Sequence, residues 1–168
     1  MAVREVLRFP DPVLKQRGRP LRPDELDQAD RLVADLVDTM RAHEGCVGLA
    51  APQIGEPVRI VVVDVSRDPK RISENGLVEL VNPVLVRAEG DELGREGCLS
   101  IPDLTANVRR ATHVVVEGLL PCGEPRSVEA NGFEARCLQH ELDHLDGILF
   151  LDRVESPSTD VFVRKRGR

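Results

Sequence analysis

Two histidines four residues apart, within the His-Glu-Leu-Asp-His segment at residues 140–144, constrain this chain more than any other feature. On a helix this spacing puts both rings on one face, where they can hold one metal ion. Glu141 lies between them and can exchange a proton with water beside that ion. Two surface histidines on an amphipathic helix are the simpler interpretation. The metal site is favoured because the motif falls in a segment with the end signals of a helix.

The sequence predicts that this helix begins at Asn131 and ends near Gly147. Asn131 and Glu134 have the spacing of a capping box, with Asn in place of Ser or Thr. Gly147 is the natural stop, because glycine readily adopts the left-handed conformation that ends helices. One face of this helix carries Phe133, Cys137, His140 and His144.

A catalytic metal site usually has three protein ligands and one open position, so a third ligand must come from elsewhere. No histidine follows His144, and the only later glutamate, Glu155, lies in a tail flanked by Ser and Pro. Cys137 is unfavourable, because its Cα would lie about 10.5 Å along the helix axis from that of His144. The third ligand is therefore expected from upstream, among Cys46, Cys98 and Cys122.

Cys98 is the best of these candidates. It follows Gly97, which permits close approach of the backbone, and precedes Leu99, whose backbone N–H would lie beside the metal. Taken alone, Cys98 would be interpreted as a small core residue. The histidine pair turns it into a candidate ligand.

The composition excludes several classes of protein. The 168 residues fit one domain, and a formal net charge of −6 argues against a body that binds DNA or another polyanion. Four Phe are the only aromatic residues, so single-stranded nucleic acid finds no stacking platform. No apolar run is long enough to span a membrane, and the N-terminus lacks the apolar stretch of a signal peptide. We therefore expect a cytoplasmic protein whose four cysteines are reduced.

Patterns elsewhere predict a second helix and several short strands. Residues 24–43 repeat apolar positions at steps of three and four and have Asp24 at an N-cap position, which predicts an amphipathic helix. Pro83 interrupts one strand-like run and favours an edge strand or two short strands there. A loop or irregular strand is expected at 45–55, buried or paired strands at 58–65, 77–86, 111–120 and 127–130, a hairpin turn at 121–125, and an extended segment at 148–154.

These elements predict an α+β fold. Short, mostly antiparallel strands would pack around a C-terminal metal-binding helix, with an N-terminal amphipathic helix in addition. Residues 1–154 would form a single catalytic domain. Residues 155–168 would be a polar and basic C-terminal tail, whose basic residues Arg164, Lys165, Arg166 and Arg168 need not touch the core.

Three segments, in this order, resemble the signature motifs of the peptide deformylases: GLAAPQIG at 48–55, EGCLSIP at 96–102 and QHELDHLDG at 139–147. The resemblance runs from about Val6 to Leu151, and the uninterrupted second motif and short chain are similar to the type 1 bacterial branch. It implies removal of the N-formyl group from the initiator formyl-methionine of nascent polypeptides. It also implies one divalent metal held by two His and one Cys, most commonly Fe²⁺, with Zn²⁺, Ni²⁺ or Co²⁺ as replacements in purified protein.

The resemblance also implies roles for individual residues. Cys98, His140 and His144 would hold the metal, and Glu141 would be the general acid and base. Gln53 and the backbone N–H of Leu99 would form the oxyanion hole. The substrate would be bound by Val47, Gly48, Phe133 and Cys137.

Two positions beside these motifs carry further expectations. Cys46 stands where the family usually has glycine, so the first motif would change its loop conformation if that position needs a positive φ. Glu96, if buried beside the metal, needs a cationic partner. Arg109 and Arg110 are near it in the sequence, and we favour Arg110; a solvated Glu96 is the alternative.

Two other functions and one partner follow from the same residues. A metalloendopeptidase would need a downstream third ligand and a longer cleft. A structural zinc module would be closed by Cys98, Cys137, His140 and His144, and would leave Glu141 and Gln53 without a use. A tail with four basic residues suits contact with the ribosome, where nascent chains emerge; a solvated end is the alternative. Those basic residues are Arg164, Lys165, Arg166 and Arg168.

Overall fold

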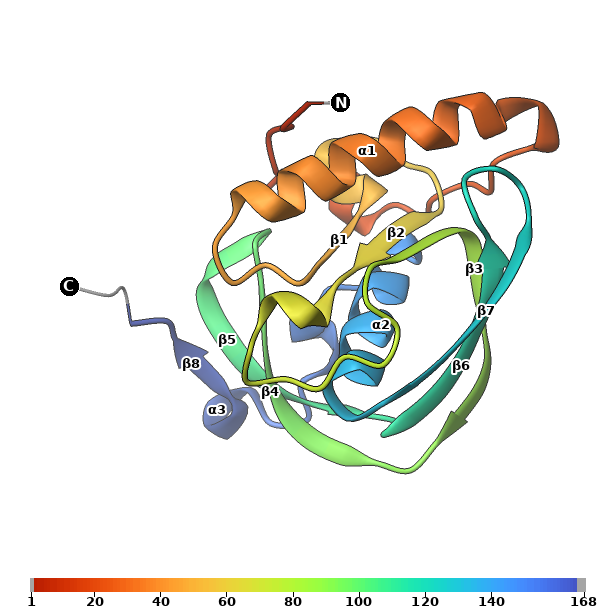
Figure 1. Cartoon of the computed structure of the whole chain (residues 1–168). Helices are drawn as coiled ribbons and strands as arrows, with labels where there is room; N and C mark the ends of the chain where they lie inside the picture. Colours follow the sequence, from red (N-terminus) through yellow and green to blue (C-terminus); the bar gives the residue numbers. More distant parts are fainter. Residues whose placement is uncertain (1, 166–168) are drawn as a thin grey trace.

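Two antiparallel sheets enclose one helix and carry a second on the outside in the computed structural model, which describes residues 2–165 (Figure 1). The larger sheet has the order β1-β2-β3-β6-β7, with β1 Gly48–Ala50, β2 Ile60–Val63, β3 Val78–Glu89, β6 His113–Leu119 and β7 Pro125–Asn131. The smaller sheet has the order β4-β5-β8, with β4 Glu92–Cys98, β5 Ile101–Arg110 and β8 Val161–Val163. The helices are α1 Leu26–Ala42, α2 Gly132–Leu145 and the short α3 Pro157–Asp160. The predicted α+β fold is confirmed.

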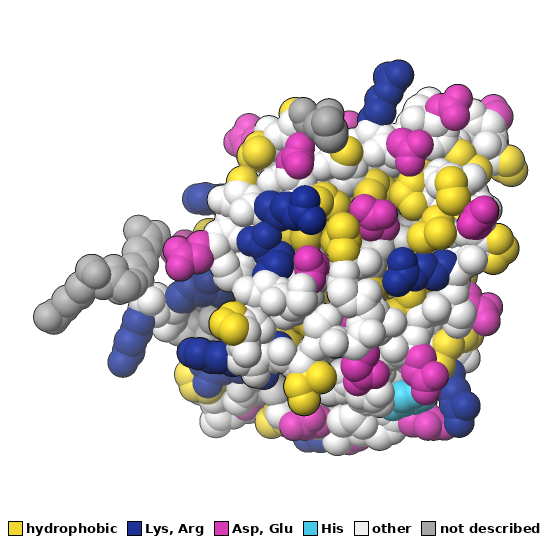
Figure 2. Space-filling model, in the orientation of Figure 1, with side chains coloured by type: hydrophobic (Ala, Val, Ile, Leu, Met, Phe, Trp, Pro, Cys, Tyr) yellow, Lys and Arg dark blue, Asp and Glu magenta, His cyan; other side chains and the backbone are white. Residues whose placement is uncertain are grey.

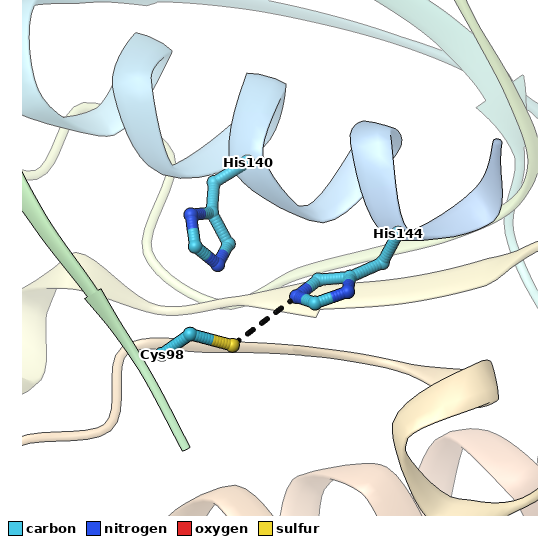
Figure 3. Close-up of side chains that lie close together, drawn as sticks. All are labelled: Cys98, His140 and His144. Atoms are coloured by element: carbon cyan, nitrogen blue, oxygen red, sulfur yellow. Dashed lines mark hydrogen bonds between the residues drawn. The ribbon is translucent and has the colours of Figure 1, made fainter. Parts of the chain in front are cut away.

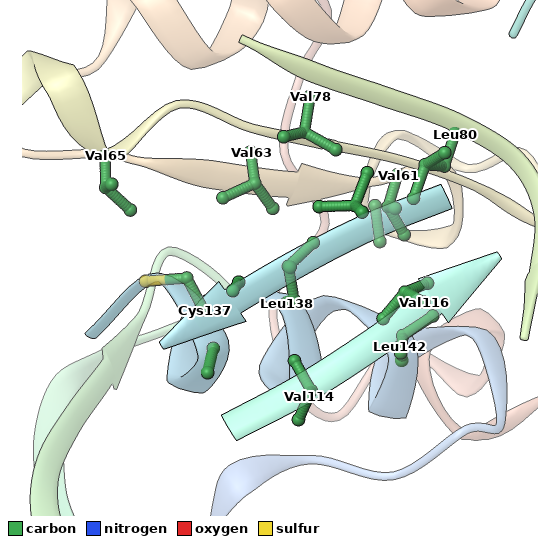
Figure 4. Packing of buried hydrophobic residues seen from close by; sticks show 14 of the residues in the cluster. Val61, Val63, Val65, Val78, Leu80, Val114, Val116, Cys137, Leu138 and Leu142 are labelled. Atoms are coloured by element: carbon green, nitrogen blue, oxygen red, sulfur yellow. The ribbon is translucent and has the colours of Figure 1, made fainter. Parts of the chain in front are cut away.

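Strand β2 is buried on both faces, which explains its uninterrupted run of β-branched residues. Val61 and Val63 point into the core beneath α2 (Figure 4). Ile60 and Val62 point the other way, into the core beneath α1. Leu138 of α2 is fully buried in the first of these cores, where truncation to alanine typically costs about 2–5 kcal/mol. The larger sheet therefore fixes α2 and the motif that α2 carries.

The start of α1 differs from the prediction. Asp24 is exposed and the helix begins only at Leu26, after the 3₁₀ turn Pro23–Glu25. The buried carboxylate is that of Glu25, which accepts the backbone N–H of Arg22 at 2.8 Å and pairs with Arg19. Asp24 as the N-cap was therefore wrong, because the neighbouring glutamate has both partners within reach. The helix face was correct: Ala29, Val33, Leu36, Val37 and Met40 are buried.

The ends of α2 confirm one signal and correct another. Gly147 has φ of 71°, and a side chain there would lie 2.5 Å from the carbonyl oxygen of Lys15, so the predicted glycine stop is confirmed. Asn131 precedes the helix, but its side chain donates to Glu74 and does not cap. Glu134 is fully buried and accepts from Asn75. The capping box was wrong, because the loop before β3 folds over the helix start and engages both side chains.

Strand β3 is continuous and lies between β2 and β6, so the predicted edge strand or pair of strands was wrong. Pro83 is accommodated at a register shift between Val81 and Val84. Beside it, Asn82 adopts φ of 51°, and its amide bonds the backbone of Leu21 in both directions at 2.8 Å. A bulge with its own partner thus replaces the ladder bond that proline cannot make.

The end of the chain is part of the smaller sheet. Val161–Val163 pairs with Leu104, Thr105 and Ala106 of β5. The prediction of a polar and basic tail at 155–168 is therefore wrong for residues 161–163, which form a strand, whereas Arg166 and Arg168 lie outside the described residues. The extended segment expected at 148–154 contains instead the 3₁₀ turn Phe150–Arg153. No helix within residues 2–165 is long and apolar enough to cross a membrane.

Candidate metal centre

Three predicted ligands converge from two elements (Figure 3). His140 and His144 project from one face of α2, and Cys98 is the last residue of β4. Their nearest ligand atoms all lie within 4.8 Å of one another, and Cys98 Sγ is 3.4 Å from His144 Nε2. Bonds of about 2.3 Å to sulfur and 2.0–2.1 Å to nitrogen in a tetrahedral site would separate these two atoms by roughly 3.6 Å. The three side chains form a metal-binding site.

The chemistry of these ligands fits a divalent transition metal. Burial opposes ionisation of the Cys98 thiol, but the charge of His144 and hydrogen bonds from both histidines hold its pKa well below the usual value. A thiolate with two imidazoles suits zinc, iron, cobalt or nickel. Cys137 is outside the cluster found within residues 2–165, and Cys122 is exposed. The four-ligand structural zinc module is therefore wrong.

Glu96 orients the His140 ring through Nδ1, the ring nitrogen that does not face the metal site. Its Oε1 lies 2.8 Å from His140 Nδ1, which leaves Nε2 of that ring for the metal. The predicted pairing with Arg110 is confirmed by two bonds of 2.9 Å, and Arg136 adds a third contact at 2.8 Å. Burial alone would oppose ionisation, but the hydrogen bonds from Arg110 and His140 hold the pKa of Glu96 well below its usual value.

Two members of this network, Arg136 and Asp143, were not predicted from the sequence. Asp143 accepts from both Arg110 and Arg153. Both missed residues are buried on α2. The sequence contains a signal for them, because charged residues on a helix that is expected to lie in the core need buried partners.

A cavity of about 310 Å³ opens onto the metal site. All six residues predicted for catalysis or substrate binding outside the metal ligands and Glu141 line it: Val47, Gly48, Gln53, Leu99, Phe133 and Cys137. The structure thus brings together residues from three distant motifs.

Glu141 lies at the wall of this cavity and is buried. Its Oε2 has no hydrogen-bond partner within the described part of the chain. Burial is the main cause that raises the pKa of Glu141 to about 7. A Cβ at Gly48 would lie 2.6 Å from Glu141 Oε1, so glycine at this position makes room for the carboxylate.

Gln53 is fixed beside the sulfur of Cys98. Its Oε1 accepts the backbone N–H of Ala50 at 3.0 Å, while its Nε2 lies 3.4 Å from Cys98 Sγ and 3.2 Å from Ser100 Oγ. Leu99 occupies the two-residue turn between β4 and β5. Both residues therefore carry N–H groups next to the metal ligand Cys98.

Cys46 does not disturb the first motif. The positive φ falls on Gly45, at 74°, and Asn82 is the only non-glycine residue within 2–165 that has one. The Cys46 thiol donates to the carbonyl oxygen of Gly48 at 3.2 Å, and burial raises its pKa to about 12. Cysteine is thus accommodated here as a neutral hydrogen-bond donor.

A buried Cys-His-His site that opens onto a cavity, with a carboxylate beside it, defines a metal-dependent hydrolase. Comparison with known proteins makes this specific. Residues 3–160 match the family model of polypeptide deformylase. The peptide deformylase of Desulforudis audaxviator is 45% identical over 166 residues, covering 98% of this chain and 99% of that relative. This chain belongs to the peptide deformylase family.

Solved structures agree with this assignment. The class I type b peptide deformylase of Acinetobacter baumannii, bound to Met-Ala-Ser, has a TM-score of 0.85 and 36% identity, covering 91% of this chain and 100% of that one. The peptide deformylase of Thermotoga maritima has a TM-score of 0.82 and 33% identity, with 93% and 100% coverage. The metalloendopeptidase alternative is not supported, because the third ligand is Cys98, upstream of the histidines.

Proposed function

We propose that this enzyme removes the formyl group from the N-terminal formyl-methionine of nascent polypeptides and releases formate. The observation that carries the proposal is that Glu141 and Gln53 line the same open cavity as the metal-binding residues Cys98 and His140. The Acinetobacter relative bound to Met-Ala-Ser supports a peptide that begins with methionine.

The cavity suits such a peptide in two ways. Val47, Phe133 and Cys137 give it an apolar wall, which fits the flexible methionine side chain. In addition, β1 and β4 are the first strands of their sheets, and both line the cavity through Gly48 and Gly97. An extended peptide can add to such open edges by backbone hydrogen bonds.

The residues around the metal divide the work of hydrolysis. A divalent ion, when bound, polarises a carbonyl group and acidifies water. Glu141 takes the proton from the attacking water and passes it to the amine nitrogen, which leaves as the new N-terminus while formate is released. Gln53 Nε2 and the Leu99 N–H donate to the oxygen that gains negative charge. Each such donor typically lowers the barrier by about 2.7–4 kcal/mol.

The metal and the cellular setting belong to the same proposal. We assign Fe²⁺ as the native ion, with Zn²⁺, Ni²⁺ or Co²⁺ as replacements, because the thiolate and two imidazoles accept each of them. The cytoplasm is the expected compartment: the four cysteines are free thiols, as a reducing environment requires. Contact of the basic C-terminal end with the ribosome remains a prediction.

Release of formate from formyl-Met-Ala-Ser, compared with release of acetate from its acetylated analogue, tests the function. We expect rapid release from the formyl peptide alone. The Cys98→Ala variant should lose the metal and the activity, whereas Cys122→Ala, a substitution at an exposed thiol, should keep both. Absence of formate release by the metal-loaded wild type would refute the proposal.

A further inference from the structure

The C-terminal strand brings two arginines to the mouth of the cavity. Arg164 directly follows β8, and its N–H donates to the carbonyl of Asp103 at 2.8 Å. Its guanidinium lies against the backbone of Gly97, where any side chain would overlap it. The guanidinium of Arg95 stacks 3.6 Å from the ring centre of Phe162, in β8 itself. Both arginines line the cavity.

Neither of these two guanidinium groups forms an ion pair with a carboxylate among residues 2–165. Arg95 instead donates to Asn107 and Thr105. The other arginines that line the cavity are paired, Arg136 with Glu96 and Arg71 with Asp68. Figure 2 shows Lys and Arg side chains gathered over β5 and β8, although the chain as a whole is acidic. Two unpaired, preorganised cations at one mouth favour a carboxylate ligand.

The position of the pair sets where on a substrate that carboxylate must lie. Arg95 is three residues before the metal ligand Cys98 on β4, a distance of about 10 Å along a strand. A peptide that runs along this edge from the metal passes Gly97 and reaches Arg95 roughly two or three residues after its methionine. Three acidic residues also line the cavity, Glu44, Glu96 and Glu141. Within the described chain, none of them forms an ion pair with Arg95 or Arg164, and Glu96 pairs with Arg110 and Arg136 instead.

We propose that Arg95 and Arg164 bind a carboxylate two or three residues after the formyl-methionine, so that this enzyme favours acidic formyl peptides. The inference rests on the proposed function and adds a substrate preference to it. The carboxylate is either an acidic side chain or, in a short peptide, the free C-terminus. The two arginines are specificity-determining residues and have no part in the proton transfers.

Three peptides separate these sources: formyl-Met-Ala-Glu amide, formyl-Met-Ala-Gln amide, and formyl-Met-Ala-Gln with a free C-terminus. The measured quantity is the ratio of kcat/KM for each carboxylate-bearing peptide to kcat/KM for the neutral amide. We expect at least one ratio of about five in the wild type, arising from a lower KM, as the upper range for exposed ion pairs allows. Either Arg164→Gln or Arg95→Gln should bring that ratio toward one, and about 0.5 M salt should weaken it.

Arg31→Gln is the matched control, because it removes the same charge from an exposed position on α1 and should keep the ratio. Ratios of one in the wild type for both carboxylates would overturn the inference and leave the deformylase function intact. A ratio that survives both Arg164→Gln and Arg95→Gln would also overturn it. Failure of the wild type to release formate from any of the three peptides would refute the proposed function itself, and the inference with it.

Discussion

Replacing Glu96 by glutamine should weaken the metal site while leaving its three ligands, Cys98, His140 and His144, unchanged. The Glu96 side chain is 4% exposed and holds Arg110, Arg136 and His140 at 2.8–2.9 Å. Removing one partner of a buried ion pair typically costs about 3–5 kcal/mol. We expect the lower end, about 3 kcal/mol, because Arg110 keeps Asp143 and Arg136 keeps three backbone carbonyls. At about 2–4 °C per kcal/mol for a chain of this size, the unfolding midpoint should fall by about 6–12 °C.

The same change should weaken metal binding by about 10- to 100-fold, since His140 loses the acceptor that orients its ring. Thermal unfolding with saturating metal and competition with a chelator measure the two effects independently. Glu92→Gln is the control, because Glu92 is exposed on the same strand. An E96Q protein with the unfolding midpoint and metal affinity of the wild type would refute the assignment of Glu96 as the support of the site.

Three further changes test the fold and the cavity. Glu25→Gln should lower the unfolding midpoint at neutral pH, whereas Asp24→Asn should not. Hydrogen bonds from Arg19 and the Arg22 N–H lower the pKa of Glu25 to about 2. The contribution of Glu25 to the free energy of unfolding is therefore complete above about pH 4.5 and is lost as the pH falls toward 2. The unfolding midpoints of the wild type and Glu25→Gln, measured from about pH 6 to about pH 3, check this prediction. A difference between the two midpoints that does not become smaller as the pH falls would contradict it. Ending the chain at Asp160 should lower both stability and activity because β8 is lost, whereas ending it at Lys165 should change neither; equal behaviour of the two truncations would show that β8 is dispensable. Gly48→Ala should reduce kcat at least tenfold without loss of metal, because the new methyl group displaces the carboxylate beside it; unchanged kcat with bound metal would contradict that packing.

The parts of the molecule that the sequence predicted well are those fixed by local spacing. A four-residue step on a helix determines that His140 and His144 share a face, whatever surrounds the helix. The long β-branched run that contains β2 predicts a strand buried on both faces, as the structure shows. Chain geometry and the motif resemblance together selected Cys98 as the third metal ligand, and the structure confirms that Cys98 lies beside His140 and His144.

What could not be predicted depends on partners that are distant in the chain. Glu25 and Asp24 are adjacent acids, and only the position of Arg19 decides which of them is buried. Pro83 lies within a central strand because Asn82 finds the backbone of Leu21, sixty-one residues away, to satisfy the bulge. In the same way, the apolar residues of β8 form a strand only because an open edge of β5 receives them.

Proton transfer by Glu141 is central to the proposed hydrolysis, and one variant tests it directly. Glu141→Gln preserves shape, so the helix, the three ligands and the metal content should stay as in the wild type, while kcat for formyl-Met-Ala-Ser should fall at least ~10²-fold. Glu117→Gln, an equal change at an exposed position on β6, should keep full activity. Near-normal kcat in a Glu141→Gln protein with one bound metal ion per chain would contradict this role, because the other buried carboxylate beside the ligands, Glu96, is already held by Arg110, Arg136 and His140 Nδ1.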